Sequence, residues 1–160
     1  MPEVEDPAHG GAGVRQQALL DRAQRGAAQL VRGLLAGSTE PCLAGAKVLA
    51  GLGGGLTPAG DDFIVGVLLA TWAGLYGSGA EALCQPIVAA AAPLTTTLSA
   101  AYLRAAARGE CMAQWHAFFE ALLRSEAQAM RAAIRALMAT GHTSGADALA
   151  GFLAVRPGRS

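Results

Sequence analysis

The segment GLGGGLTPAGDD, residues 51–62, carries the strongest chemical signal in this chain. Glycines that lead into a helix N-terminus expose backbone N–H groups at the positive end of the helix dipole, and such sites bind phosphates and carboxylates. The segment has neither the GK[ST] of a Walker A loop nor the GxGxxG of a dinucleotide-binding loop. A tight turn that allows close helix packing is the alternative interpretation. The residues expected to contact a small anion are Gly53, Gly54, Gly55, Thr57 and Gly60.

Two aspartates, Asp61 and Asp62, directly follow the glycines. Three roles are open to them. They could supply hard oxygen ligands for Mg²⁺, accept hydrogen bonds from amide or ureido N–H groups of a substrate, or place favourable negative charge at a helix N-terminus. We expect no resident metal, and Mg²⁺ is the cofactor only if Asp61 and Asp62 are its ligands.

The first turns of two helical segments resemble each other. Residues 59–68 read AGDDFIVGVL and residues 144–153 read SGADALAGFL, so that Asp62 aligns with Asp147. Chance similarity between alanine-rich helices is one explanation. The other is that two equivalent helix starts converge on one site. That hypothesis gives Asp61, Asp62 and Asp147 as catalytic candidates and Ser144 and Gly145 as substrate-binding candidates.

Further polar candidates lie near these helix starts. His142 precedes the second one and is the histidine best placed for acid–base catalysis near pH 7. A cluster of hydroxyl residues at 95–99 exceeds what one helix cap needs, so Thr96 and Ser99 are substrate-binding candidates. No histidine or cysteine spacing is typical of a zinc site.

The composition indicates an all-α protein. Of the 160 residues, 52% are hydrophobic and only 5% are aromatic, which favours close-packed helices over a β-sandwich. We expect a compact multi-helix bundle in which the glycine-rich loop leads into a central buried helix. Lys and Arg together number 12, as do Asp and Glu, and this balance argues against nucleic-acid binding.

The chain divides into a flexible tail, residues 1–13, and a single helical domain, residues 14–156. Residues 38–42 are expected to form a turn, and residues 43–52 are helix or strand. Thr57 is expected as the N-cap of the central helix, with Pro58 at its first position. The expected helices are 14–35, 58–76, 79–92, 94–109, 111–124, 126–139 and 144–156.

The cysteine pattern and the N-terminal residues favour a cytoplasmic location. The three cysteines form no CxxC pair, and the N-terminal residues lack the basic and apolar regions of a signal peptide. Residues 63–80 carry no charge, but glycines interrupt them, which favours a buried helix over a membrane span.

Three segments resemble a known family. GLGGGLTPAGDDFIVG is similar to the hallmark G-L-G-x-G-L-T-P-S-G-D-D-F-L-x-G of a bacterial family long listed as of unknown function. TTTLSAAYLRAAARGE, residues 95–110, and GHTSGADALAGFL, residues 141–153, also resemble it in the same order. The similarity covers roughly residues 45–155, and Ala59 stands where the family usually has serine.

The resemblance implies a function. The family includes a subunit of oxamate carbamoyltransferase from allantoin degradation, which converts oxalurate and phosphate to oxamate and carbamoyl phosphate together with other subunits. It implies a carbamoyltransferase subunit that binds a small anionic substrate, with the carboxylate on the glycine loop and ureido N–H groups on the aspartates. His142 would move a proton. Family members also carry a longer N-terminal portion, so residues 14–156 would correspond to the C-terminal part of a longer architecture.

Two other functions stay open. One is an Mg²⁺-dependent hydrolase or phosphotransferase that uses Asp61, Asp62 and Asp147 as ligands. The other is a non-catalytic helical partner subunit with an exposed apolar docking surface.

Overall fold

The structure, a computed structural model, describes residues 7–75 and 79–155, and the regular elements in them are helices. The expectation of an all-α protein is confirmed. The α-helices are α1 (Pro7–Leu35), α2 (Thr39–Leu49), α3 (Ala59–Ala70), α4 (Ala80–Ala91), α5 (Thr97–Ala107), α6 (Ala113–Arg124), α7 (Ala127–Met138) and α8 (Ser144–Ala154); a π-helical turn η1 (Thr71–Leu75) and a 3₁₀ turn η3 (Ala92–Leu94) complete the set.

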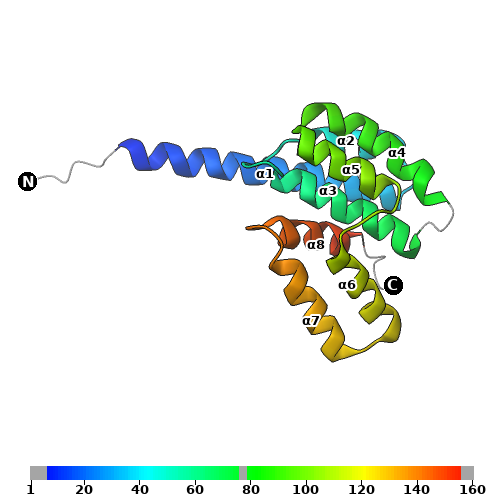
Figure 1. Ribbon diagram of the computed structural model, residues 1–160. Helices are drawn as coiled ribbons and strands as arrows, with labels where there is room; N and C mark the ends of the chain where they lie inside the picture. Colours follow the sequence, from blue (N-terminus) through cyan, green and yellow to red (C-terminus); the bar gives the residue numbers. More distant parts are fainter. Residues whose placement is uncertain (1–6, 76–78, 156–160) are drawn as a thin grey trace, which may run out of the picture.

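Helix α3 is the central element, and α8 lies alongside it (Figure 1). The two helices touch through their glycines. A Cβ atom built on Gly66 would overlap the carbonyl oxygen of Ala148, and one built on Gly151 would overlap that of Phe63. Since Gly66 aligns with Gly151 and Phe63 with Ala148 in the internal similarity, the two contacts are copies of each other. The repeated sequence therefore builds a two-fold-like helix pair.

Helix α1 extends well beyond the body of the molecule (Figure 1). Residues 11–20 are exposed, whereas the C-terminal half of the helix packs on α2. Gly45 allows this close packing, because a Cβ there would overlap the backbone nitrogen of Leu30. Residues 7–13 are helical, and residues 1–6 of the expected tail lie outside the described residues.

An aromatic cluster attaches α6 to α8. Trp115, Phe118 and Phe119 of α6 surround Phe152 of α8, with ring centroids 5.3 to 5.8 Å from it. The Phe118–Phe152 pair is edge-to-face and the other two pairs are tilted, and such ring contacts add to the stabilisation from burial of apolar area. The cluster fixes the position of α8 relative to α6, and hence one wall of the cavity described below.

Several local expectations need correction. Residues 39–42 were expected in a connecting turn but form the first turn of α2. Residues 43–52, expected as helix or strand, are helical up to Leu49. Thr57 is not the N-cap of α3: Pro58 occupies that position, and its ring has no atom that could form a side-chain cap bond. The Thr57 hydroxyl bonds to Ser144. The central helix becomes π-helical after Ala70, and its expected end near Tyr76 lies outside the described residues.

Across residues 7–75 and 79–155, no helix combines the length and apolar character needed to cross a bilayer.

Candidate active site at two helix starts

The N-terminal ends of α3 and α8 lie together. The hydroxyl of Thr57, just before α3, is 3.0 Å from the hydroxyl of Ser144, the first residue of α8. Asp62 and Asp147, one in the first turn of each helix, are close enough to interact electrostatically. Two helix dipoles thus point their positive ends at the same region, where they stabilise negative charge.

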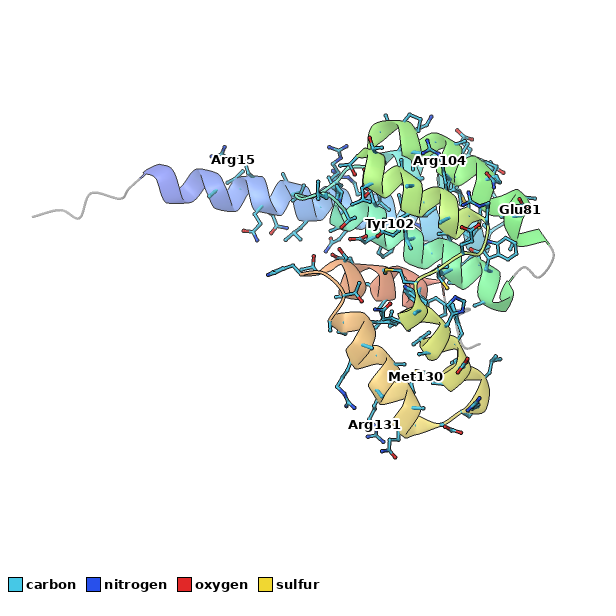
Figure 2. The ribbon with its side chains drawn as sticks, in the orientation of Figure 1. Arg15, Glu81, Tyr102, Arg104, Met130 and Arg131 are labelled. Carbon is cyan, nitrogen blue, oxygen red and sulfur yellow. The ribbon has the colours of Figure 1, made fainter. Side chains whose placement is uncertain are left out.

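A cavity of about 240 Å³, here named the Asp62 cavity, opens between α3, α5 and α8. Its polar groups are the Asp62 carboxyl and the hydroxyls of Thr57, Ser144, Thr140 and Tyr102. Tyr102 lies on the side of α5 that faces α8 (Figure 2). The other lining residues are Val65, Leu98, Met112, Trp115, Leu137, Gly141, Gly145 and Ala148.

The carboxyl group of Asp62 lies in an unusual electrostatic environment. Its Oδ2 atom is buried and has no hydrogen-bond partner among the described residues. The pKa of Asp62 is raised to about 6, chiefly by burial; the negative charges of Asp147 and Asp61 add to the rise, and the hydroxyls of Ser144 and Thr57 partly offset it. A carboxyl with a pKa near neutrality serves as a general acid or base in the physiological range.

A second cavity, here named the Asp147 cavity, has a volume of about 340 Å³ and lies against α1. The Oδ2 atom of Asp147 is also buried without a partner in the described part of the chain. The two aspartates are neighbours, but they line different cavities. The linings correspond: Leu52, Ala59, Gly60 and Phe63 of the Asp147 cavity align with Leu137, Ser144, Gly145 and Ala148 of the Asp62 cavity.

The remaining aspartate, Asp61, holds the loop in place. Its side chain is buried, Oδ1 accepts a hydrogen bond from the Gly51 backbone N–H at 3.0 Å, and Oδ2 accepts one from the Thr95 hydroxyl. Both carboxylate oxygens are therefore occupied within the protein. Asp61 ties the beginning of the glycine loop to the segment before α5.

The glycine loop itself is largely open to solvent. Gly53, Gly54 and Gly55 are exposed, and no partner for their backbone N–H groups exists among the described residues. Positive φ angles of 118° at Gly53 and 89° at Gly55 explain why glycine is needed there. The Thr96 hydroxyl anchors the end of the loop by donating a 2.6 Å hydrogen bond to the Leu56 carbonyl oxygen, and it also caps α5 through the Ser99 N–H.

Comparison with protein families matches residues 49–156 to a family described as oxamate carbamoyltransferase subunit AllH. The chain belongs to the AllH family. No solved structure matches the chain.

The AllH match covers the whole of the two helix starts. It begins at the last residue of α2 and continues past the end of α8, so both cavities receive most of their lining from it. Helix α1 and nearly all of α2 precede the matched region. The chemistry-bearing groups therefore belong to the AllH portion, and the α1 wall of the Asp147 cavity does not.

The site residues predicted from sequence fall into three groups: those that line the Asp62 cavity, those that line the Asp147 cavity, and those that line neither. Asp62, Thr57, Ser144 and Gly145 line the Asp62 cavity, whereas Asp147, Gly53 and Gly60 line the Asp147 cavity. The candidates that line neither cavity are Asp61, Gly54, Gly55, Thr96, Ser99 and His142. Of these, His142 is exposed in the turn next to Gly141, and Ser99 is buried with its hydroxyl unpartnered.

Sequence reasoning missed the α5 and α6 side of the cavity. Leu98 and Tyr102 are one helical turn apart on α5, within the segment that already resembled the AllH family. Their i, i+4 spacing after the Thr96 cap is a signal that identifies a shared helix face. Trp115 and Met112 carried no comparable signal.

Positive charge is absent from the linings of both cavities, as far as the described residues show. Lys47, Arg104 and Arg108 are exposed and line neither cavity, and Arg108 pairs with Glu110 at 2.8 Å. Within the described ranges, no group of three or more His, Cys, Asp or Glu side chains is arranged to hold a metal ion. The AllH site thus offers hydroxyls, backbone N–H groups and carboxylates.

Proposed function

We propose that this AllH-family chain is the subunit of an oxamate carbamoyltransferase-type enzyme that holds the amide-bearing acid, oxamate or oxalurate, in the Asp62 cavity. The observation that carries the proposal is the buried, unpartnered Oδ2 of Asp62 beside the paired hydroxyls of Thr57 and Ser144. An unpartnered buried carboxylate oxygen costs free energy unless a ligand supplies a donor.

The chemistry of the ligand fits the polar groups of the cavity. Oxamate carries an amide nitrogen with two N–H groups at one end and a carboxylate at the other. The amide would donate to Asp62, and the carboxylate would accept from hydroxyls such as that of Tyr102. A cavity of about 240 Å³ is large enough for so small an acid and leaves room for a second reactant.

The transfer step needs a proton acceptor at the amide nitrogen. As that nitrogen attacks the carbamoyl carbon of carbamoyl phosphate, the new N–C bond forms, the C–O bond to phosphate breaks, and phosphate leaves with the bonding electron pair. The nitrogen gives up one proton, which the Asp62 carboxylate accepts. In the reverse direction, protonated Asp62 returns it to the leaving oxamate nitrogen, consistent with a pKa of about 6.

Asp61 and the glycine loop would act by positioning. Asp61 orients the loop through Gly51 and Thr95, and Thr96 holds Leu56 next to Thr57. The exposed N–H groups at Gly53–Gly55 would face an anion approaching from outside. Such catalysis relies on orientation and electrostatic stabilisation, without a covalent intermediate.

Thermal unfolding of the full chain tests the proposal. Oxamate, phosphate, carbamoyl phosphate and Mg²⁺ would each be titrated into the wild type, into Asp62→Asn and into Glu120→Gln, an exposed acid on α6 that serves as the matched control. A ligand at about a hundred times its dissociation constant stabilises a protein by about 2.7 kcal/mol.

We expect oxamate to stabilise the wild type and the control but not Asp62→Asn. Stabilisation by Mg²⁺ alone would favour the metal-dependent hydrolase or phosphotransferase. No stabilisation by any of the four would contradict the proposal and favour the non-catalytic partner.

A further inference from the structure

Negative charge dominates the region around the two helix starts. Asp61, Asp62 and Asp147 lie close enough that the charges of the other two act on Asp62. No lysine or arginine lines either cavity in the described parts of the chain. A substrate with its own carboxylate would add a further negative charge to this region, with only helix dipoles and hydroxyls to compensate.

We propose that a companion subunit docks over the mouth of the Asp62 cavity and inserts a cationic side chain beside Asp62. This inference rests on the proposed function, since it completes the same site. A guanidinium or ammonium group there would neutralise the aspartate cluster and bind the substrate carboxylate. Charge-assisted hydrogen bonds of this type are about twice as strong as neutral ones.

The rim of the cavity has the character of a docking surface. Four large apolar side chains are exposed there: Leu56 by 73%, Leu98 by 42%, Tyr102 by 42% and Met112 by 38%. They are neighbours, because three of them line the cavity and Leu56 is tied to Thr96 at the start of α5. Clustered apolar side chains around a polar centre are typical of protein interfaces.

The surface continues along α5. A neighbouring cavity of about 260 Å³ shares Val65, Tyr102, Met112 and Trp115 with the Asp62 cavity and extends to Cys111. Its walls are mainly apolar, so it would receive apolar side chains of the same partner segment. A partner segment that carries apolar residues next to a lysine or arginine would fit both cavities: the apolar residues would enter the neighbouring cavity, and the cation would enter the Asp62 cavity.

The projecting part of α1 has the opposite character. It carries Arg15 away from the body (Figure 2), and Arg22 and Arg25 follow on the same helix. Asp21 lies among them, and the three arginines leave this stretch with a positive net charge, opposite to that of the Asp62 cavity. A charge reversal at the cavity rim therefore tests the rim separately from α1.

A pair of variants at one exposed position tests the inference. Leu56→Lys and Leu56→Glu remove the same apolar side chain but introduce opposite charges next to the cavity. Leu123→Lys on α6, where the leucine is 85% exposed and away from the rim, is the matched control. Each full-length variant would be titrated with the separately purified companion subunits of the same enzyme, and the dissociation constant measured at low and high salt.

We expect Leu56→Lys to weaken binding of the companion subunits by about tenfold or more at low salt, because like charges repel at the rim. Leu56→Glu should weaken it much less, and Leu123→Lys should leave it unchanged. An equal loss of affinity in both Leu56 variants would overturn the inference that the partner is cationic. So would unchanged binding in both, binding to a second copy of this chain in place of a companion, or no binding by the wild type.

The outcomes separate the two proposals. If oxamate stabilises the chain through Asp62 but companion binding ignores the sign of the charge at residue 56, the proposed function stands and this inference fails. If oxamate does not stabilise the chain, the proposed function itself fails.

Discussion

The hydroxyls of Thr57 and Ser144 lie 3.0 Å apart although the two residues are 87 positions apart in the sequence. This bond joins the two helix starts and lies beside Asp62, whose ionised form both hydroxyls stabilise. The expectation that both helix starts converge on one pocket is therefore met only in part: the two starts are neighbours, but Asp62 and Asp147 line separate cavities.

Ser144→Ala removes one partner of that bond and one hydroxyl that stabilises the Asp62 carboxylate. We expect the pKa of Asp62 to rise above that of the wild type and the protein to lose about 1 kcal/mol of stability. NMR titration of the Asp62 side chain in both proteins would check this. Thr143→Ala, an exposed hydroxyl one residue earlier, is the control. An unchanged titration in Ser144→Ala would contradict the assignment of the hydroxyl.

Asp62→Asn should change how stability depends on pH. The pKa of Asp62 is raised from 3.8 to about 6, so the folded chain binds this proton more tightly than the unfolded chain does. Its contribution to the free energy of unfolding therefore decreases as pH rises between about 4 and about 6, and is constant above that window.

The asparagine variant lacks this contribution. At pH 7 it should be more stable than the wild type by about 1 kcal/mol, after allowance for solvent screening at a half-buried group. Urea unfolding between pH 4 and pH 8 measures the difference. A difference between the two proteins that is independent of pH would show that the Asp62 carboxyl is not perturbed.

Asp61→Ala should lower the stability of the fold. It leaves the Gly51 N–H and the Thr95 hydroxyl without their acceptor and creates a buried gap, which together should cost about 2–4 kcal/mol. Thr95→Val should cost less, because the Gly51 bond remains. Chemical denaturation would check the order. If Asp61→Ala were as stable as the wild type, the proposal that Asp61 holds the glycine loop in place would be wrong.

Gly66→Ala should disrupt the contact of α3 with α8. The added methyl group would overlap the Ala148 carbonyl oxygen, which belongs to backbone and cannot turn aside, so we expect a loss of about 3 kcal/mol or more. Gly54→Ala is the matched control, since no atom lies within 4 Å of a Cβ there and its φ is not positive. Comparable unfolding midpoints for the two variants would contradict the direct helix contact.

The sequence predicts the helices and the two glycine–aspartate starts because these depend on local propensity and repetition. Gly66 and Gly74 both interrupt the uncharged segment at 63–80, but only Gly66 packs against the backbone of another helix; Gly74 is exposed, and no atom lies within 4 Å of a Cβ built there. Periodicity alone does not say which glycines meet another helix.

The side of the site built by α5 and α6 depends on long-range packing. Thr57 looked like a helix cap because Thr-Pro is a local signal, but a hydroxyl from the other helix start competes for it. Asp61 and Asp62 are adjacent and chemically identical, yet one is tied to Gly51 and Thr95 and the other faces a cavity. Only the three-dimensional arrangement separates their roles.

The most direct test of the account is isothermal titration of oxamate into the full chain, alone and with its companion subunits, for the wild type, Asp62→Asn and Glu120→Gln. We expect saturable binding by the wild type and by Glu120→Gln, tighter in the complex, and a loss of at least tenfold in affinity in Asp62→Asn. Equal affinity in wild type and Asp62→Asn would contradict the central claim that the Asp62 cavity holds the substrate.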